Sequence, residues 1–306
     1  MGEISISNLN SSKRKGIILA GGKGSRLYPI TKATCKQLLP VFDKPMIYYP
    51  LTTLMMAGIR EVLIVTNKID LEIFKRLLGN GGELGMSIEY AIQPNPNGIV
   101  EAILIGEKFI DRSPLALILG DNIFHGASLI ERLKSVSKKI HTSTIFAYHV
   151  KDPENFGVVE FTKTGKVVNI EEKPKNPKTN FAIPGLYFYD NSVLEKSTKI
   201  KPSIRGELEI TDLNKLYLDH KNLNIEILGR GTAWLDAGTF ESLYEASSYI
   251  KSLETRHGLK VGCPEEIAWR NKWIDDEKLI EIAIPLLKSG YGEYLLKLPE
   301  EISLKF

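Results

Sequence analysis

Glycines and basic side chains near the start of the chain form its first candidate for chemistry. An apolar run over 17–20 is followed by glycines at positions 21, 22 and 24, with Lys23 and Arg26 beside them. Glycine lets the backbone bend sharply and approach a ligand closely, and such loops surround phosphates with N–H groups. An arginine can grip a phosphate with two hydrogen bonds. We interpret the segment as a site for the polyphosphate of a nucleotide, although a glycine-rich turn after a strand is often only a turn.

Two better-known phosphate loops do not fit this segment. The fingerprint G-x-G-x-x-G fails because Leu27 occupies the place of its third glycine, and no G-x-x-x-x-G-K-[ST] motif is present. The loop therefore excludes the dehydrogenases and kinases that depend on these motifs.

Two carboxylates form the second candidate. Asp121 follows the apolar run 115–119, and Asp236 follows Trp234-Leu235. In open α/β sheets the ligand crevice lies beyond the carboxyl ends of the strands. Both carboxylates could therefore reach one Mg²⁺, which takes one or two protein carboxylates together with substrate phosphates. Taken alone, Asp121 is equally well explained as the cap of a helix or turn.

A second pair of cations completes the pattern. Lys173 ends a strand-like segment and Arg205 precedes a helical one, so they could hold an anion separate from the one under Lys23 and Arg26. Two anion sites and a two-carboxylate metal site suit nucleotidyl transfer, in which a sugar phosphate attacks the α-phosphorus of a nucleotide and pyrophosphate leaves. That reaction needs no enzyme nucleophile, since positioning and charge neutralisation supply the catalysis.

Strands and helices alternate in the first half of the chain, and they must carry these side chains to one edge. Such alternation predicts a mostly parallel sheet that is covered on both faces. Pro50 lies within the first expected helix, so it should remove an internal hydrogen bond and kink that helix. The expected strands are 17–20, 62–66, 87–91 and 115–119, and the expected helices are 44–58, 71–78 and 98–110.

The second half of the chain is mixed, and it should extend the same sheet and add a substrate-facing lobe. The expected organisation is a poorly ordered extension over 1–14, a core over 15–250 divided near 142, and a C-terminal segment over 251–306. The expected strands are 143–150, 157–161, 167–171, 185–189 and 225–228, with a hairpin turn at 163–166. The expected helical segments are 192–199, 207–220 and 276–288, and the segments 251–259 and 264–273 precede the last of them.

The composition excludes several classes of protein. The 306 residues are 43% hydrophobic and 25% charged, with a net charge of +3, which fits a globular protein and provides no basic surface for nucleic acid. Cys35 and Cys263 form neither a metal-ligand pattern nor a disulfide framework. The sequence shows no secretory signal and no apolar run long enough for a membrane span, so a cytoplasmic protein is expected.

Several long strings resemble one family, the sugar-nucleotide pyrophosphorylases. The resemblance extends from Arg14 to about Leu298 and points to the long, tetrameric type that uses dTTP. It is carried by Leu19-Ala-Gly-Gly-Lys-Gly-Ser-Arg-Leu27, Lys36-Gln-Leu-Leu-Pro40, Asp43-Lys-Pro-Met-Ile-Tyr-Tyr-Pro50, Leu119-Gly-Asp-Asn-Ile-Phe124, Arg205-Gly-Glu-Leu-Glu-Ile-Thr-Asp212 and Cys263-Pro-Glu-Glu-Ile-Ala268. The resemblance implies a Rossmann-like α/β fold, with a mixed, mostly parallel sheet between helices and a small C-terminal helical extension. The implied reaction makes dTDP-glucose and pyrophosphate from dTTP and glucose 1-phosphate with Mg²⁺, as the first step of dTDP-rhamnose and related dTDP-deoxysugar biosynthesis.

The resemblance also implies which residues form the site. Nucleotide binding is expected at Leu19, Gly21, Gly22, Gly24, Ser25, Arg26, Gln37, Gln93, Gly98 and Asp121. Sugar-phosphate binding is expected at Gly157, Glu172, Lys173, Tyr187, Arg205 and Trp234. Mg²⁺ is expected between Asp121 and Asp236, and the catalytic charges are Arg26, Lys36, Asp121, Lys173, Arg205 and Asp236.

The C-terminal segment implies a second site. Long members of the family are homotetramers with a regulatory nucleotide site at a subunit contact, which implies feedback inhibition by a dTDP-sugar. An ordinary oligomerisation or packing element would explain the same segment. By similarity, the regulatory residues are Gly126, Arg230, Lys260, Val261, Glu266, Ile267 and Arg270.

Departures from the family pattern bear on selectivity and regulation rather than on the catalytic charges. Phe156, Glu101 and Ala237 stand where relatives carry Tyr, Gln and Thr, and His125 and Gly262 stand where the regulatory site has Tyr and Ser. Two alternatives therefore stay open. The chain could transfer a uridylyl group or use another hexose 1-phosphate, or it could be a sugar-nucleotide-binding regulator without catalysis.

Overall fold

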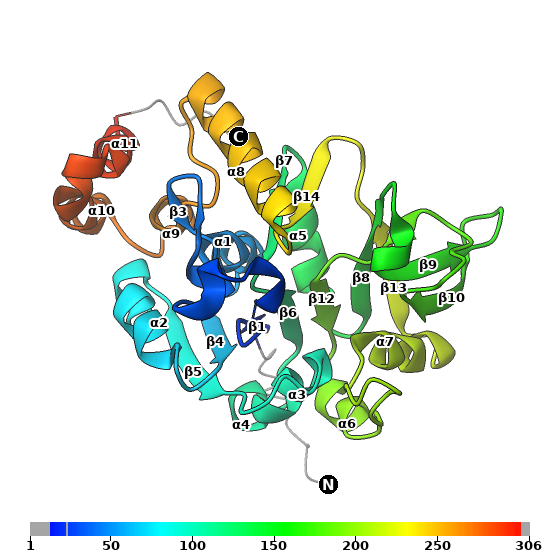
Figure 1. The fold of residues 1–306 in the computed structure, drawn as a ribbon. Helices are drawn as coiled ribbons and strands as arrows, with labels where there is room; N and C mark the ends of the chain where they lie inside the picture. Colours follow the sequence, from blue (N-terminus) through cyan, green and yellow to red (C-terminus); the bar gives the residue numbers. More distant parts are fainter. Residues whose placement is uncertain (1–12, 23, 301–306) are drawn as a thin grey trace, which may run out of the picture.

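A mixed sheet runs through the middle of the molecule, in a computed structural model that describes residues 13–22 and 24–300 (Figure 1). The strand order is β10-β9-β11-β8-β12-β6-β1-β4-β5, and β13 pairs with β8 beside that path. β1 lies in parallel between β4 and β6, and β5 continues in parallel beyond β4. These parallel strands are β1 (Lys15–Leu19), β4 (Glu61–Thr66), β5 (Ser87–Ile92) and β6 (Leu115–Leu119).

The other half of the sheet is largely antiparallel. β12 runs against β6 and β8, β9 runs against β10 and β11, and β13 runs parallel to β8. The expected hairpin turn joins β9 to β10, with the N–H of Thr162 donating to the carbonyl of Lys166 at 2.7 Å. The strands here are β8 (Ser143–His149), β9 (Gly157–Phe161), β10 (Val167–Glu172), β11 (Phe181–Ala182), β12 (Leu186–Tyr189) and β13 (Leu223–Ile227).

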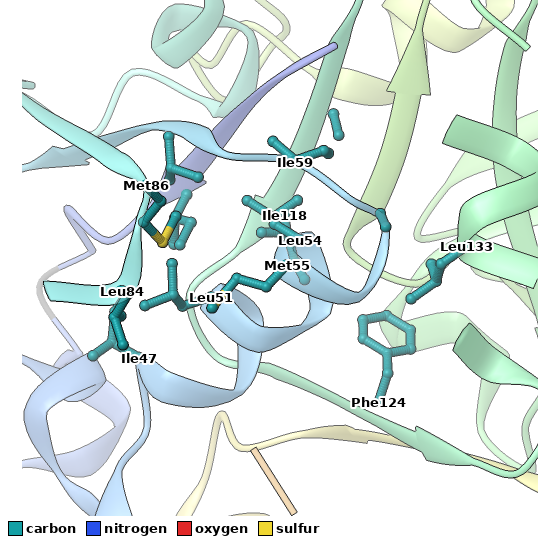
Figure 2. Close-up of a cluster of buried hydrophobic side chains, with 14 of the residues drawn as sticks. Ile47, Leu51, Leu54, Met55, Ile59, Leu84, Met86, Ile118, Phe124 and Leu133 are labelled. Atoms are coloured by element: carbon teal, nitrogen blue, oxygen red, sulfur yellow. The ribbon is translucent and has the colours of Figure 1, made fainter. Parts of the chain in front are cut away.

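Successive residues of the parallel strands fill two separate cores, one on each face of the sheet. Ile18 packs in the core that contains Leu54 of α1 (Tyr48–Met56), and Figure 2 shows the side chains of α1 within that core. Its neighbour Ile17 packs in the other core, which α3 (Ile99–Ile105) covers. Because both faces are covered, β1, β4 and β6 are largely continuous apolar runs, whereas the edge strand β5 alternates between apolar and polar residues.

The other helices up to α7 divide between the same two faces. α2 and α5 contribute to the core around α1, whereas α4, α6 and α7 contribute to the core beside α3. Their bounds are α2 (Leu71–Leu78), α4 (Glu107–Ile110), α5 (Leu129–Lys138), α6 (Val193–Ser197) and α7 (Ile210–Asp219).

Two short antiparallel ribbons stand apart from the main sheet. β7 (Asn122–Gly126) pairs with β14 (Thr232–Asp236), and β2 (Pro40–Val41) pairs with β3 (Lys44–Pro45). The first ribbon begins directly after Asp121. It therefore joins a residue expected in the metal site to a strand more distant in the sequence.

Helices end the described chain. Thr239 begins α8 by accepting a hydrogen bond from the N–H of Ser242 at 3.2 Å, and Gly258 ends it with a φ of 72°. Because α8 crosses position 250, the expected core and C-terminal segment share one helix. Figure 1 shows α10 and α11 beside α9, at the opposite end of the molecule from β9 and β10. The bounds are α8 (Phe240–His257), α9 (Pro264–Arg270), α10 (Asp276–Ala283) and α11 (Tyr291–Lys297), with a 3₁₀ segment over Ile284–Ser289.

The expectation of a kinked helix over 44–58 is wrong. Residues 44–45 pair with β2, and α1 begins only at Tyr48. Pro50 therefore falls in the first turn, where backbone N–H groups have no partner inside the helix. At that position proline removes no internal hydrogen bond and requires no kink.

The extension expected over 1–14 lies largely outside the described residues. Within them, Arg14 is buried and donates to the carbonyls of Leu115 at 2.8 Å and Tyr189 at 2.6 Å. The folded core therefore begins at or before Arg14. Over 13–22 and 24–300, no helix combines the length and the apolar character that crossing a membrane requires.

Candidate active site

The ribbon of β7 and β14 brings the two expected metal ligands together. Asp236 ends β14 opposite Asn122, the first residue of β7, and the N–H of Ala237 donates to the backbone carbonyl of Asp121 at 3.2 Å. Burial, and then the charge of Asp121, raise the pKa of Asp236 to about 6. The two carboxylates are thus close enough to repel each other across the edge of the sheet.

Cations surround the same pair. Lys36 is buried and forms an ion pair with Asp121. Burial acts to raise the pKa of Asp121, but Lys36 and a hydrogen bond from Asn122 outweigh it and lower that pKa. Lys36, Arg26 and Lys173 all act to lower the pKa of Asp236. The structure therefore gathers five of the six expected catalytic charges around one point.

The donor set fits Mg²⁺. Asp121 and Asp236 offer hard carboxylate oxygens, and their mutual repulsion is the kind that a shared cation removes. In the described part of the chain, no group of three or more His, Cys, Asp or Glu side chains gathers as a metal site. A two-carboxylate site leaves positions for substrate phosphates, which is the usual arrangement for this ion.

Asn122 is a positioning residue that the sequence did not reveal. Its Nδ2 donates to Asp121 at 2.9 Å, and its Oδ1 accepts from the indole N–H of Trp234 at 2.7 Å and from the N–H of Gly185 at 2.9 Å. The ring of Trp234 packs against Phe156, with centroids 5.0 Å apart. Trp234 was expected beside the sugar, but its N–H is used to hold Asn122 and, through it, Asp121.

The glycine loop follows β1 at the same edge. Gly24 has a φ of 60°, a backbone conformation that glycine adopts without strain. A Cβ on Gly21 would lie 3.1 Å from Oε1 of Gln93, whereas nothing lies within 4 Å of one on Gly22. Lys23 lies outside the described residues. Gly22 thus leaves its backbone open to a ligand, while Gly21 lets Gln93 approach.

The remaining residues expected to bind the nucleotide lie around this loop. Leu19 ends β1 half-buried, and its carbonyl accepts from the N–H of Gly120 at 2.9 Å. Ser25 and Arg26 are exposed, and the Arg26 guanidinium lies against Gly238, beside Asp236.

Gln37 is buried behind the loop. It is only 4% exposed, and its Oε1 makes no hydrogen bond within the described residues. A buried, unpartnered oxygen at such an edge is consistent with a place for a ligand donor.

The expected sugar side is built around Glu172, at the end of β10. Its Oε2 accepts from Thr211 at 2.5 Å, and a Cβ on Gly157 would lie 3.3 Å from the same oxygen. Tyr187 is buried, and its pKa is raised by burial and by the charges of Glu172 and Asp121. Lys173 follows Glu172 in the sequence, and its backbone has a φ of 44°. Because the charges of both Glu172 and Asp121 act on Tyr187, the residues expected to bind the sugar lie next to the carboxylate pair.

Arg205 lies on this side but is already occupied. Its Nη2 contacts both carboxylate oxygens of Glu209, at 2.8 and 2.9 Å, and lies 3.6 Å from Glu172 and 3.7 Å from Glu207. The expected pairing of Arg205 with Lys173 around a phosphate therefore has to compete with these glutamates for the guanidinium.

A cavity of about 1460 Å³ lies near the C-terminal helices. Arg230 is not among its lining residues, whereas His125 and His257 are, and burial and then the charge of His257 lower the pKa of His125. Gly262 also lines it with a φ of 72°, and a Cβ there would come within 2.6 Å of the Tyr49 ring. The expected regulatory residues that line the cavity are Gly126, Lys260, Val261, Glu266, Ile267 and Arg270.

Sequence comparison identifies the family to which this site belongs. A family model described as nucleotidyl transferase matches residues 15–252. A Neisseria meningitidis protein named glucose-1-phosphate thymidylyltransferase is 56% identical over 284 residues, covering 93% of this chain and 99% of the relative. A Mycobacterium tuberculosis protein of the same name is 56% identical over 286 residues, covering 94% and 99%. The chain belongs to the nucleotidyl transferase family, in its glucose-1-phosphate thymidylyltransferase branch.

Solved structures agree with this assignment. A Bacillus anthracis structure, assigned the same activity and crystallised with sucrose, matches this nucleotidyl transferase with a TM-score of 0.71 and 41% identity, over 77% of this chain and 94% of its own. A UDP-glucose pyrophosphorylase complexed with UDP-glucose matches with a TM-score of 0.68 and 28% identity, over 78% and 99%. The family and the fold class expected from the sequence are both confirmed.

Proposed function

We propose that this nucleotidyl transferase moves a thymidylyl group from dTTP to α-D-glucose 1-phosphate, giving dTDP-glucose and pyrophosphate. The observation that carries the proposal is the pair Asp121 and Asp236, faced by Lys36, Arg26 and Lys173. Such a cluster neutralises charge at a phosphorus centre without offering a nucleophile of its own. The names of the relatives at 56% identity describe the same activity.

The nucleotide would enter along the glycine loop. Backbone N–H groups of Gly21, Gly22 and Gly24 would receive the phosphates, and Arg26 would neutralise the pyrophosphate as it leaves. Lys36 would offset charge on the transferred phosphate, since its ammonium already lies against Asp121. The unpartnered Oε1 of Gln37 would accept a hydrogen bond from the deoxyribose hydroxyl. These groups would align the α-phosphorus for attack by the sugar phosphate.

Asp121 and Asp236 would hold the Mg²⁺. Bound there with the phosphates, the ion would supply further stabilisation of negative charge during transfer. Asn122 would keep the Asp121 carboxylate in place through its bond of 2.9 Å. Lys36 would remain close enough to limit how strongly the two carboxylates repel each other.

The sugar phosphate would bind on the opposite side of the pair. Lys173 and Arg205 would hold its phosphate, with Arg205 released from Glu209 as the ligand enters. Glu172 would accept from sugar hydroxyls, beside the buried Tyr187. This arrangement directs a phosphate oxygen of the sugar toward the α-phosphorus.

We also propose a regulatory role for the cavity, in a homotetramer. Lys260 lines it and is ion-paired with Asp43 and, at 3.3 Å, with Glu254. The phosphates of a dTDP-sugar would compete with these carboxylates for Lys260. Feedback inhibition predicts that dTDP-rhamnose lowers the initial rate, and an unchanged rate at saturating dTDP-rhamnose would refute it.

The catalytic proposal is tested by pyrophosphate release over a substrate panel. The panel pairs dTTP or UTP with glucose 1-phosphate or N-acetylglucosamine 1-phosphate, in MgCl₂. We expect dTTP with glucose 1-phosphate to give the highest kcat/KM. Faster turnover with UTP or with the other sugar would favour the alternative transferase. A parent protein that turns over no pair would instead favour a regulator that only binds sugar nucleotides.

The metal assignment is tested in the same assay with single variants. Asp121→Asn and Asp236→Asn should each lower kcat by about 100-fold or more, as expected when an electrostatic group is lost from a transition state. Asp152→Asn, which removes an exposed carboxylate, is the matched control and should be unchanged. Near-parental turnover in either of the first two variants would overturn the assignment.

A further inference from the structure

The amide of Gln93 is held by a carboxylate at a position where relatives of the chain were expected to carry an amide. Its Nε2 donates to Oε2 of Glu101 at 2.7 Å and to the carbonyl of Gly98 at 3.3 Å. An amide nitrogen carries two hydrogens, so both are used. Glu101 also accepts from the side chain of Asn97 at 2.9 Å and from its backbone N–H at 3.3 Å.

These partners permit only one orientation of the Gln93 amide. A carboxylate and a backbone carbonyl can only accept hydrogen bonds, so a flipped amide would set its oxygen against both of them. Oε1 therefore points the other way, where a Cβ on Gly21 would lie 3.1 Å from it. Gln93 thus presents an acceptor, and no donor, to the glycine loop.

The backbone fixes each member of this group. The N–H of Gln93 donates to the carbonyl of Thr66 at 2.7 Å, at the end of β4. Gly98 has a φ of 110° and packs against the backbone of Leu208, where a Cβ would collide. Glu101 lies in the first turn of α3, where the helix dipole favours its negative charge. Glu101 is therefore held as the hydrogen-bond acceptor, and the Nε2 of Gln93 is held as the donor.

We propose that Glu101 is a positioning residue that sets base selectivity by locking the carbonyl of Gln93 toward the nucleotide. The inference rests on the proposed function and on the nucleotide binding expected at Gln93, whose amide would meet the edge of the pyrimidine. Thymine and uracil carry an N–H at ring position 3, which an amide oxygen can accept. Cytosine carries a lone pair at the same place, so two acceptors would face each other. Cytosine also lacks the 5-methyl group of thymine and carries an amino group at position 4, but these differences are the same in parent and variant, so the change in the ratio between the two proteins reports the hydrogen bond.

The competing explanation is that Glu101 only stabilises the start of α3. A glutamate in the first turn of a helix commonly does this. That role affects the stability of the protein and the overall level of activity, but it does not distinguish thymine from cytosine. The deciding quantity is therefore the ratio of kcat/KM for dTTP to kcat/KM for dCTP, with glucose 1-phosphate in MgCl₂.

The experiment compares the parent with Glu101→Gln. A glutamine at 101 can either donate or accept, so the longer contact with the carbonyl of Gly98, at 3.3 Å, is left to oppose a flip of the Gln93 amide. The ratio should fall by about 10-fold or more, as expected when an imposed mismatch of hydrogen-bonding groups is relieved. Most of the change should be in KM, because the catalytic charges are untouched. Glu107→Gln is the matched control: it removes an exposed first-turn glutamate from α4 and should leave the ratio unchanged.

A second background makes the result decisive. With Gln93→Ala already in place, Glu101→Gln should no longer alter the ratio, because the group that it orients is gone. An unchanged ratio in the single variant, or an equal change in both backgrounds, would overturn the proposal. Dissociation constants of dTTP and dCTP, measured by calorimetry, give the same comparison without turnover. A parent without pyrophosphate release would therefore refute the proposed function and still test the role of Glu101.

Discussion

Asp236→Asn should stabilise the ligand-free protein while it removes turnover. The pKa of Asp236 is raised from 3.8 to about 6, because the carboxyl is buried and because Asp121 repels its charge. A pKa difference of about 2 is equivalent to about 3 kcal/mol. Since the side chain is only partly buried, we discount this for solvent screening and expect a gain of about 2 kcal/mol. Asparagine keeps the shape of the side chain and removes the repulsion.

The sign of the pH dependence follows from the direction of the pKa shift. A carboxyl whose pKa is raised by folding destabilises the folded state once it ionises. Parent and variant should therefore unfold alike below about pH 4, where the carboxyl is protonated in both states. The advantage of the variant should develop as the pH rises from about 4 to about 6, where the unfolded chain has lost the proton and the folded chain still holds it, and it should be complete above about pH 7.

Thermal unfolding across this pH range is the assay. For a chain of this length, about 2 kcal/mol corresponds to a rise of about 3 °C in Tm. Added Mg²⁺ and dTTP should reverse the order, because only the parent keeps both carboxylates for the ion. Asp152→Asn, the exposed control, should show no difference that develops with pH. A gain of equal size at pH 4 and pH 8, or no gain at all, would show that the repulsion between the carboxylates is not what we infer.

Three further substitutions test other parts of the structure. Arg14→Ala removes a buried guanidinium that donates to several carbonyls, so urea unfolding should show a loss of about 2 to 4 kcal/mol while kcat at 25 °C is retained. Lys44→Met removes the 2.8 Å partner of the buried Glu254 and leaves it the longer pair with Lys260 at 3.3 Å, so the substitution should cost up to about 3 kcal/mol, measured in the same way. Adding Glu254→Gln to the Lys44→Met variant should restore part of the lost stability, and no recovery would contradict the ion pair between Lys44 and Glu254. Trp234→Phe keeps the ring but loses the bond to Asn122, so kcat should fall about 5-fold with KM for dTTP unchanged, and an equal rise in KM would argue against positioning through Asp121.

The features that could be predicted from the sequence are those whose signals are local. The strand before the glycine loop and the strand before Asp121 are short apolar runs, and the structure places them where those runs are. The rule that ligands bind beyond the carboxyl ends of the strands then predicted that Asp121 and Asp236 lie at one edge of the sheet. It could not show how the two residues come together. They meet because 122–126 and 232–236 pair as a ribbon, and pairing across such a separation leaves no local pattern.

Side-chain partners were harder to predict, because they depend on which elements pack together. Trp234 was expected at the sugar, yet Asn122 takes its N–H. Arg205 was expected to hold a phosphate, yet neighbouring glutamates hold it in the structure. For Glu101 the sequence indicated only that the residue type was unusual. Its contact with Gln93 depends on the end of β5 lying beside the start of α3, which only the fold establishes.

The ribbon of β7 and β14 has a consequence that extends beyond the carboxylates. Asp236 and the residue before Asn122 occupy one end of it, while His125 and Gly126, near the other end, form part of the cavity wall. A strand of this length spans about 15 Å, and its paired hydrogen bonds make it stiff along its axis. A ligand bound in the cavity would therefore contact the same ribbon that carries Asp236 at its other end. Substitutions that shift the cavity end of the ribbon should therefore also shift the carboxylate of Asp236.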